Sequence, residues 1–514
     1  MKNKIAILGV ASALVVGILA ACSDQLEQDV NGVSSIETFY ATDDDAQLAI
    51  VSTYDMLTAD NLFDWASPTF IKTLPSDEGT AGGGGSTDQP RYQSLDNFTW
   101  DSSNPAITAT WTVNYYGVFR ANMIVQNLEP ENDLRKRIIG EAKALRAYFY
   151  LELVTQFGDV PLVLKGLEPA EFNQARVPKA DVYAQIEADL NDAIAVLPNK
   201  SEYAAGDQFR ASKGTAYALL GKVLLYQEKY AEAATAFDNV TGYSLVSNYA
   251  DVFTQAQEFG EESILEASFS NNVPYSWDYP WGRVENNLHV QLMGARAGST
   301  PELGLIAGWG FNYPSEKLWD AYEADDTRRD ATILSEQQYL SYKSTNPDFD
   351  GSTWWDYNRF FRLKYGSFGD ESASDPNAPK ELNYGTNWRL IRYADILLLR
   401  AEAKLQSGDA AGALADVNQV RARAGVPALP SVTMQDIIDE RFVELAFEGH
   451  RYFDLIRWGE AVANAELGVQ VPSAFAGGDP AHYGDNFKFS KHQLFPIPVS
   501  DIAAATNMTQ NPEY

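Results

Sequence analysis

The sequence predicts a mainly α-helical protein in which paired helices support a loop-rich, ligand-binding face. Three observations lead to this prediction. Apolar residues recur at helical spacing over long stretches, and two of these stretches repeat one hairpin pattern. Aromatic residues, 12% of the chain, gather in long segments without a helical or strand period. Such segments are usually functional or disordered, and disordered ones are poor in aromatics, so we expect ordered binding loops.

Residues 1–21 have the pattern of a secretion signal. Two lysines precede an uncharged, mostly apolar run from Ile5 to Ala21, which is shorter than the roughly 20 apolar residues of a transmembrane helix. The only cysteine, Cys22, follows directly, as in the lipobox of bacterial lipoproteins. We therefore expect Cys22 to be acylated and residues 22–33 to form a flexible tether to a membrane. An ordinary secreted protein with a chance cysteine is the alternative.

The expected helices follow in chain order. Residues 46–57 place Leu48, Val51, Tyr54 and Leu57 on one face of a helix. Further amphipathic helices are expected over 134–157, 181–197 and 434–457.

Two helical stretches repeat one pattern. Gly221 in the first and Ala401 in the second each precede an alanine, Ala233 or Ala413, by the same interval across a turn. Small residues let two antiparallel helices approach closely, as in tetratricopeptide-like hairpins. We expect such units over about 134–240 and 390–460, and unrelated amphipathic helices are the alternative.

Charge and cysteine content exclude several classes of function. The formal net charge is −31, and an acidic chain repels nucleic acid, anionic lipid and polyanions. With a single cysteine the chain forms no internal disulfide and no cysteine-based metal site. Acidic charge combined with abundant aromatics favours a binder of neutral ligands.

Two stretches near the C-terminus carry a family signature. Asn387–Ala403 contains Trp388-Arg389-Leu390-Ile391-Arg392-Tyr393-Ala394-Asp395, and Glu440–Gly459 contains Glu448-Gly449-His450-Arg451-Tyr452-Phe453-Asp454. Both resemble the SusD/RagB family of surface glycan-binding lipoproteins. The agreement extends to 34–40, 111–122 and 313–329, so with Cys22 the resemblance covers essentially the whole chain.

The resemblance implies a single SusD-like domain over 34–514, an α/α superhelix with four tetratricopeptide-like units. It implies a lid on a SusC-like TonB-dependent transporter, held at the surface of the outer membrane by the lipid on Cys22. Such proteins capture an oligosaccharide or polysaccharide and deliver it for uptake without cleaving it, so no enzyme activity is expected. In relatives the tetratricopeptide side commonly meets the transporter.

The charged residues of the second signature are expected to be structural. Arg451, Asp454 and Arg457 are three residues apart and lie along one helix face. Glycoside hydrolysis instead needs two carboxyl groups flanking a cleft, about 5–10 Å apart. We therefore expect a charged hydrogen-bond network that holds this helix in the core.

The binding loops are expected over about 74–104, 269–313 and 346–387. Within the second loop, Trp277, Tyr279 and Trp281 offer flat rings that match the C–H faces of sugars. Asp278 and Arg283 lie beside them and could bind hydroxyl groups. Packing of the two tryptophans onto the scaffold is the alternative.

Other loop residues are weaker candidates for the glycan site. Trp309 lies between two glycines and is either exposed or tightly packed, and Trp354 has a tryptophan neighbour that points the opposite way in an extended chain. Asp77, Arg91 and Tyr92 lie in the loop where relatives often supply polar contacts. Trp111, Trp319, Trp388 and Trp458 are expected in the core.

Enzyme and cofactor motifs are nearly missing from the sequence. It holds no zinc helix, no nucleophile elbow and no phosphate loop. Asp348-Phe349-Asp350-Gly351 resembles part of a calcium loop, so calcium is an open alternative to having no cofactor. The favoured ligand is a neutral glucan, for example a β-glucan such as laminarin. A peptide-loading lid and a surface glycoside hydrolase are the alternatives.

Overall fold

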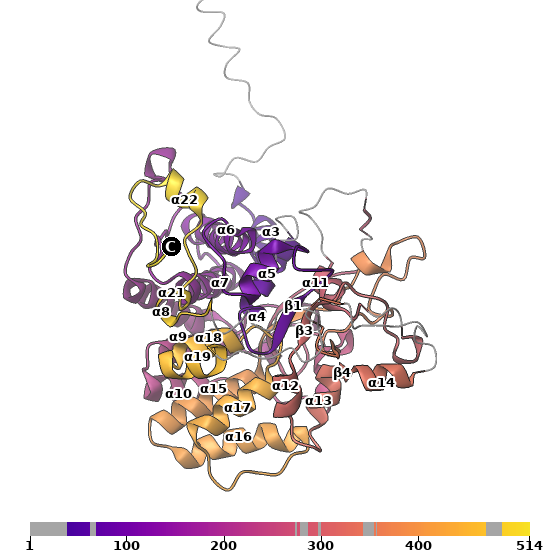
Figure 1. Cartoon of the computed structure of the whole chain (residues 1–514). Helices are drawn as coiled ribbons and strands as arrows, with labels where there is room; N and C mark the ends of the chain where they lie inside the picture. The colour runs from indigo at the N-terminus through magenta and orange to yellow at the C-terminus, as the bar shows by residue number, and fades with distance from the viewer. Residues whose placement is uncertain are drawn as a thin grey trace, which may run out of the picture.

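The computed structural model describes residues 39–61, 68–272, 275–277, 286–296, 300–342, 354–355, 357–468 and 486–514. Helices dominate and the strands are short, which confirms the predicted mainly α-helical class (Figure 1). Among these residues, no helix is both long enough and apolar enough to cross a membrane. Cys22 and its tether lie outside the described residues.

The helices are distributed over the whole described chain. The N-terminal half contains α3 (Asp43–Tyr54), α4 (Pro68–Thr73), α5 (Pro90–Asp96), α6 (Pro105–Asn127), α7 (Asp133–Phe157), α8 (Lys179–Val196), α9 (Lys213–Tyr226) and α10 (Tyr230–Asp238). The C-terminal half contains α11 (Leu288–Met293), α12 (Glu316–Ala321), α13 (Thr327–Thr332), α14 (Glu336–Ser341), α15 (Tyr393–Gln406), α16 (Ala410–Ala424), α17 (Met434–Glu444), α18 (Arg451–Arg457), α19 (Glu460–Leu467), α21 (Phe489–His492) and α22 (Val499–Ala504).

Local sequence fixes where the long helices begin. Asn104 caps α6 by accepting hydrogen bonds from the backbone N–H groups of Ala106 and Ile107, and Pro105 occupies the first helical position. Thr433 forms a capping box with Asp436 at the start of α17. Such caps satisfy donors that the first helical turn leaves unpaired.

Helical hairpins form one side of the molecule. Neighbouring helices pack in the order α6, α7, α8, α9, α10, α15 and α16, with α3 against α6 and α7. In the α9–α10 hairpin, a Cβ on Gly221 would lie 2.4 Å from the ring of Phe237, so the glycine is what allows this close approach. Ala401 and Ala413 are fully buried between α15 and α16. The hairpins predicted around these small residues are thus present.

The second signature does not form the single helix that the sequence pattern predicts. Helix α17 ends at Glu444, and α18 begins at Arg451. Between them Phe447 and Gly449 adopt positive φ angles of 63° and 84°, which a helix does not allow. The chain therefore turns sharply and α18 packs against α4 and α19.

Among the described residues, three two-stranded antiparallel sheets connect the segments of the loop-rich side. β1 (Gly79–Gly82) pairs with β3 (Phe311–Pro314), β2 (Ser263–Ala267) with β6 (Trp388–Arg392), and β4 (Ile333–Ser335) with β5 (Phe360–Arg362). In the first sheet Gly79 faces Pro314 and Gly82 faces Phe311. The predicted binding loops are therefore less irregular than expected. The sequence does not reveal these strands, because elements of three to five residues are too short to show a period of two.

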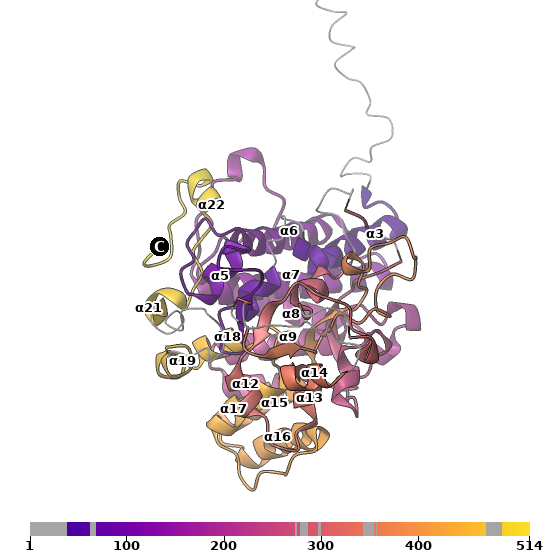
Figure 2. The same cartoon turned by 45° about the vertical axis from the view of Figure 1, so that its right-hand side comes forward.

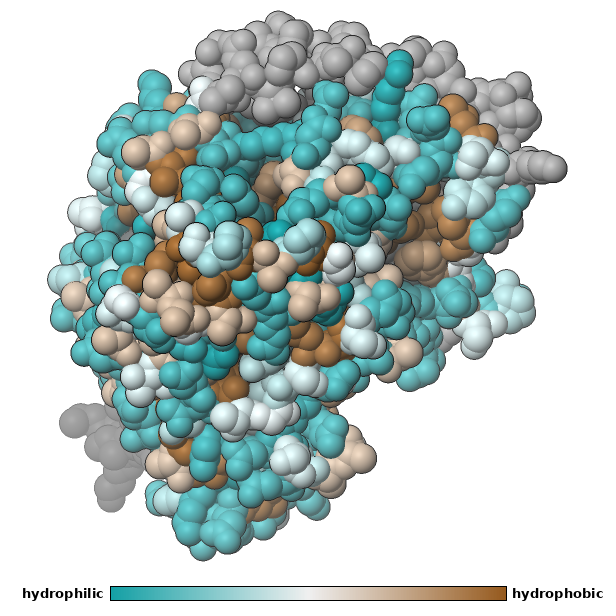
Figure 3. All heavy atoms as spheres, turned by 90° about the horizontal axis from the view of Figure 1, so that it is seen from below, coloured by the Kyte–Doolittle hydropathy of each residue, from teal (hydrophilic) through white to brown (hydrophobic). Residues whose placement is uncertain are grey.

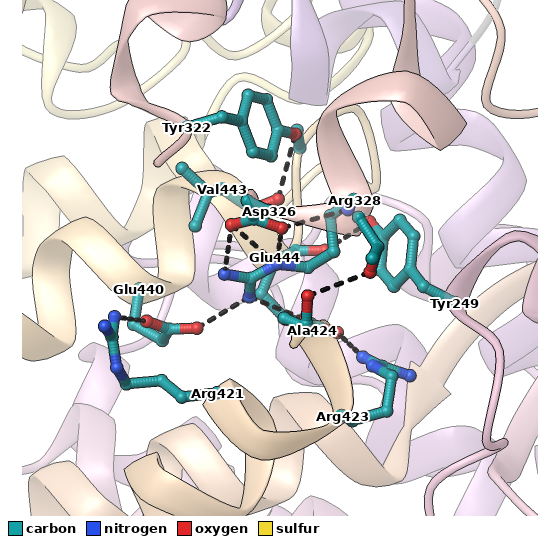
Figure 4. A network of polar contacts seen from close by, with 12 residues as sticks. Tyr249, Tyr322, Asp326, Arg328, Arg421, Arg423, Ala424, Glu440, Val443 and Glu444 are labelled. Carbon is teal, nitrogen blue, oxygen red and sulfur yellow. Dashed lines mark hydrogen bonds and ion pairs between the residues drawn. The ribbon is translucent and has the colours of Figure 1, made fainter. Parts of the chain in front are cut away.

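A buried ion-pair network joins α13, β6, α16 and α17. Glu444 accepts hydrogen bonds from Arg328 at 2.9 Å and from Arg392 at 2.6 Å. It also pairs with Arg423, and Figure 4 shows the polar contacts around Arg328 and Arg423. Arg328 binds Asp326 as well, and the side chains of the cluster are at most 3% exposed. Burial opposes the charge on Glu444, but the three guanidinium groups hold its pKa well below the ordinary value.

The signature residues are structural, as predicted, but most of their partners differ from the predicted ones. Asp454 does pair with Arg457, three residues on, at 2.8 Å. Arg441 binds Asp454 and Asp395, the latter at 2.8 Å. Arg451 does not pair within its own helix. It donates two 2.8 Å hydrogen bonds to Asp77, in the segment between α4 and β1.

The C-terminal segment closes the N-terminal half of the core. The indole Nε1 of Trp100 donates to the Tyr514 hydroxyl at 2.8 Å, and that of Trp111 donates to Asp501 at 2.9 Å. The Asn511 amide donates to the carbonyl groups of Phe157 and Phe495. The largest cluster of buried apolar residues accordingly runs from α3 to the segment just before α22.

Helix α3 turns a different face to the core than its apolar pattern suggests. Ala46, Ala49 and Ile50 are buried, whereas Leu48 is 62% and Val51 48% exposed. The small residues fit the close contact with α6 and α7, and the larger ones point outward. Seen from below, the surface is mostly hydrophilic with several separate hydrophobic patches (Figure 3).

Candidate functional site

The candidate site is an open hollow of about 540 Å³ on the loop-rich side. Its described lining comes from four segments of the chain, around residues 88, 277, 292–296 and 308–311. The pairing of β1 with β3 and the packing of α11 beside β3 help to bring these segments together. The lining residues are Asp88, Gln89, Trp277, Leu292, Arg296, Gly308, Trp309 and Phe311. The structure thus brings two of the predicted aromatic residues, Trp277 and Trp309, into one hollow.

The two tryptophan rings form a bent pair. Their centroids lie 6.1 Å apart and their planes are inclined by 33°. Trp277 is 52% exposed, and its Nε1 donates a 3.4 Å hydrogen bond to Glu381. Trp309 is half-buried and packs against a cluster of Tyr275, Leu288 and Leu382. One ring is therefore about half exposed to solvent, and the other packs against the protein behind it.

Backbone contacts hold both rings in place. The side chain of Asn383 accepts from Tyr275 N at 2.6 Å and donates to Tyr275 O at 2.9 Å, which fixes the chain two residues before Trp277. Trp309 N donates to Gln291 O at 2.9 Å. A Cβ on Gly308 would lie 2.2 Å from the carbonyl carbon of Gly294, so only glycine lets these two chain segments touch.

Polar groups stand at the rim of the hollow. Asp88 accepts a 2.7 Å hydrogen bond from Gly84 N, and Arg296 donates to Trp309 O at 3.1 Å while its side chain remains exposed. The Gln89 Oε1 atom is buried and accepts no hydrogen bond from any residue that the structure describes. Gln89 also has a left-handed backbone, with φ of 49°.

The lining carries balanced charge. Among its described residues, Asp88 is the acid and Arg296 is the base. Two wide aromatic faces with a few hydrogen-bonding groups are typical of sites for neutral polyhydroxylated ligands. The arrangement therefore suits a sugar better than a strongly charged molecule, although the whole chain is acidic.

Two predicted site residues, Asp77 and Tyr92, lie in the interior, which corrects the prediction. Both oxygens of Asp77 bind Arg451, and Lys317 donates to it at 2.6 Å. Burial opposes its charge, but these cations keep the pKa of Asp77 below its ordinary value. Tyr92 is fully buried against Phe70, with ring centroids 4.4 Å apart. Neither side chain is available to a ligand at the surface.

Arg91 and Trp354 are not among the residues that line the hollow. Arg91 is half-buried on α5. Trp354 is partly buried, and its ring packs on Tyr357 with centroids 5.2 Å apart. Its neighbour Trp355 donates to the Gln93 side chain at 2.9 Å. Trp354 therefore belongs to a packed aromatic cluster rather than to the glycan platform that the sequence suggested.

Several predicted residues cannot be placed. Asp278, Tyr279, Trp281 and Arg283 lie outside the described residues, as does the calcium-like segment 348–351. In the part of the chain that the structure does describe, no group of three or more His, Cys, Asp or Glu side chains is arranged to hold a metal ion.

Sequence reasoning missed Asp88, Gln89, Leu292 and Arg296. Asp88 and Gln89 come shortly after a run of four glycines, and a glycine run predicts a flexible loop without a defined binding site. The sequence signal that could have identified them is Pro90, which is typical of the first position of a helix. Asp88 and Gln89 therefore lie in the turn just before the N-terminus of α5. Nothing in the sequence places Arg296 beside Trp309, because that contact depends on the pairing of two glycine-containing segments.

Comparisons with known proteins agree with this fold. A family model described as "SusD family" matches residues 261–514, and one described as "Starch-binding associating with outer membrane" matches 79–225. SusD-like protein P2 of Formosa agariphila is 27% identical over 543 residues, covering 96% of this chain and 97% of that protein.

Two solved structures are similar over nearly their full length. A laminarin-binding SusD-like protein is 33% identical with a TM-score of 0.79, covering 92% of this chain and 99% of that one. Surface glycan-binding protein A from Bacteroides thetaiotaomicron, in complex with laminarihexaose, is 26% identical with a TM-score of 0.78, covering 91% and 99%.

Proposed function

The chain belongs to the SusD/RagB family, and from that premise we propose that it is a glycan-binding lipoprotein of the cell surface. Its role is to capture an oligosaccharide or polysaccharide and pass it to a SusC-like transporter in the outer membrane. The observation that carries the proposal is the bent pair of Trp277 and Trp309 in an open hollow with balanced charge.

Stacking on the two rings supplies the binding energy. A tryptophan can bury on the order of 150–250 Å², and at about 25 cal/mol per Å² this amounts to several kcal/mol. Association and ordering entropy remove much of that gain, so two rings acting together are needed. The polar side chains of Asp88 and Arg296 then select the orientation of the sugar through its hydroxyl groups.

The favoured ligand is a neutral β-glucan such as laminarin. The balanced charge of the lining supports a neutral ligand, and two similar structures are titled as a laminarin binder and as a complex with laminarihexaose. A ring pair inclined by 33° also offers a curved surface rather than a flat one. That shape suits a glucan chain that bends from one sugar unit to the next.

The captured glycan leaves uncleaved. Hydrolysis of a glycosidic bond needs two carboxyl groups about 5–10 Å apart across the scissile bond. Among the described residues that line the hollow, Asp88 is the one that carries a carboxyl group. Capture and release therefore account for this arrangement without a catalytic step.

Affinity electrophoresis tests this proposal. The mature protein without its lipid is run through gels that contain laminarin, starch, an anionic polysaccharide or no polysaccharide. We expect retardation by laminarin and a loss of about tenfold or more in affinity for Trp277→Ala and for Trp309→Ala, the size expected for a central aromatic contact. Phe172→Ala, which removes a side chain that is 62% exposed elsewhere, is the matched control and is expected to bind normally.

The gel has other outcomes that decide the question. Retardation that survives both tryptophan substitutions would move the site away from the hollow. No retardation by any polysaccharide would overturn glycan capture, and binding of a peptide mixture by the same protein in calorimetry would then support a peptide-loading lid.

A further inference from the structure

The run of four glycines at residues 82–85 does more than give the chain flexibility. Gly82, the last residue of β1, and Gly83 have positive φ angles of 64° and 89°, which residues with a side chain rarely adopt. A Cβ on Gly82 would lie 2.3 Å from the Gly310 carbonyl oxygen, and one on Gly83 would lie 2.5 Å from the Phe311 ring. These two positions therefore need glycine so that β1 can pair closely with β3.

The next two glycines have no such requirement in the backbone, because neither Gly84 nor Gly85 has a positive φ angle. At Gly85, nothing lies within 4 Å of a Cβ. At Gly84, which is exposed, a Cβ would lie 3.0 Å from Asp88 Oδ2 and 3.3 Å from Arg296 Nη2. The side chain that Gly84 lacks would therefore fill a space between an acid and a base. The turn around this space leads into α5, which lies beside α6 in both views (Figure 1, Figure 2).

Asp88 and Arg296 are held in place on either side of this space. Asp88 Oδ2 accepts a hydrogen bond from Gly84 N at 2.7 Å, and Arg296 Nη1 donates to Trp309 O at 3.1 Å. Asp88 Oδ1 and Arg296 Nη2 form no hydrogen bond with any residue that the structure describes, and the two side chains form no ion pair with each other. Both side chains line the hollow together with Trp309, and both retain hydrogen-bonding capacity for a ligand.

The separation of the two charged groups suits one bridging oxygen atom. Asp88 Oδ2 and Arg296 Nη2 both lie within 3.3 Å of the same point. The gap between them is therefore no wider than two hydrogen bonds that meet at one atom, each about 2.7–3.2 Å long. The bridging oxygen has to accept a hydrogen bond from the guanidinium group and donate one to the carboxylate. In a neutral sugar, a hydroxyl group does both.

We propose that this space, which we call the Gly84 slot and which is bounded by Gly84, Asp88 and Arg296, receives one hydroxyl group of the captured sugar. The inference rests on the proposed function and adds to it a feature that the sugar must have. The hydroxyl group donates to the Asp88 carboxylate and accepts from the Arg296 guanidinium group, and the charges strengthen both bonds. Gly84 is then a specificity-determining residue, because any side chain there would occupy the position of the hydroxyl group.

The Gly84 slot selects between glycans that the tryptophan pair alone would accept. Stacking depends on the flat face of the sugar, and substitution of one hydroxyl group leaves that face available. An ether oxygen accepts from Arg296 but has no proton to donate to Asp88, and a sulfate or carboxylate group is repelled by the Asp88 carboxylate. The preferred ligand is therefore a glucan with a free hydroxyl group at this position.

Calorimetric titration with laminarin tests the slot in two matched glycine variants. Gly84→Ala places a methyl group in the slot and is expected to weaken laminarin binding about tenfold, the effect of losing one charge-assisted hydrogen bond. Gly85→Ala adds the same methyl group in open space and should bind normally. The melting temperature should be unchanged in both variants, because the methyl group at Gly84 meets only the ends of two side chains.

Two further measurements separate the slot from a general effect on the loop. Arg296→Met should weaken laminarin binding, and the double variant Gly84→Ala/Arg296→Met should bind no more weakly than the weaker single variant, since both changes remove the same contact. Laminarin whose hydroxyl groups are O-methylated should bind equally to the unmodified protein and to Gly84→Ala, because neither can donate or receive the hydroxyl proton.

The outcomes distinguish the slot from glycan capture as a whole. Equal binding of laminarin by Gly84→Ala and Gly85→Ala would overturn the slot and leave glycan capture intact. Additive losses in the double variant, or a lowered melting temperature of Gly84→Ala, would do the same. If the unmodified protein does not bind laminarin at all, the proposed function fails and the slot fails with it.

Discussion

Glu78 is a buried acid at the start of β1, and its environment favours the neutral form. Burial together with the neighbouring Asp77 carboxylate raises the pKa of Glu78 to about 8. In the unfolded chain its pKa is near 4.3. Between these values the folded state holds a proton that the unfolded state has lost, so stability contributed by Glu78 is complete below about pH 4 and falls as the pH rises towards 8.

Replacing Glu78 by glutamine should flatten this pH dependence. The free energy of unfolding of the unmodified protein is expected to decrease between pH 5 and 8 by as much as about 1.4 kcal/mol per pH unit more than that of Glu78→Gln. Urea unfolding at pH 5, 6, 7 and 8 measures it. Parallel curves for the two proteins would show that Glu78 is ionised in the folded state.

Glu444 stands at the centre of the buried network, where three arginines share it. Glu444→Gln leaves cationic partners buried without their counter-charge, which costs about 3–5 kcal/mol of stability. Glu323→Gln is the control, because the Glu323 side chain is 49% exposed in its pair with Arg421, and exposed pairs contribute about 1 kcal/mol or less. Equal loss in both variants, measured by denaturant unfolding, would contradict a central role for Glu444.

At the scale of single residues, the sequence predicts which residue types bind but not which of them are exposed. Trp277 and Trp309 were identified from ring chemistry, and both reach the hollow. Asp77 is a weaker candidate from its place in a predicted loop, and the partner that buries it, Arg451, is 374 positions away in the chain. Burial of a side chain depends on which distant element covers it, and the local sequence does not predict which element that is.

At the scale of elements, the α9–α10 hairpin depends on one glycine. The ring of Phe237 fills the space that a side chain at Gly221 would need. Gly221→Val is therefore expected to separate the helices and to lower stability by more than about 2 kcal/mol through overpacking. Gly206→Val is the control, since nothing lies within 4 Å of a Cβ at Gly206. A similar melting temperature for both variants would contradict this account.

The sequence predicts long elements better than short ones. Helices of fourteen residues or more, such as α7, α9 and α15, contain several turns, and their period is visible. The break between α17 and α18 is not visible in the sequence. Phe447 has a positive φ angle there, which is uncommon for a residue other than glycine and is not predicted by its type. The strands that frame the hollow are too short to show alternation, so the shape of the site could not be predicted.

At the scale of the whole molecule, we expect attachment to the membrane to depend on one atom, the Cys22 sulfur. Cys22→Ala should convert the protein from a detergent-extracted membrane fraction to a freely soluble one while retardation by laminarin is unchanged, because the hollow is built from other residues. Phase partitioning of cell extracts measures this. Retention of the variant in the membrane fraction would mean that protein contacts alone hold it there.

The bonds from Trp100 to Tyr514 and from Trp111 to Asp501 have a consequence for biogenesis. We expect the exported chain to cross the inner membrane with its N-terminus first, and these bonds form only after residues 501 and 514 have emerged. Closing loops of about 400 residues is slow. We therefore expect the N-terminal half to complete its packing only after residues 501–514 have crossed, so that the emerging polypeptide stays unfolded enough to pass through the export channel until then.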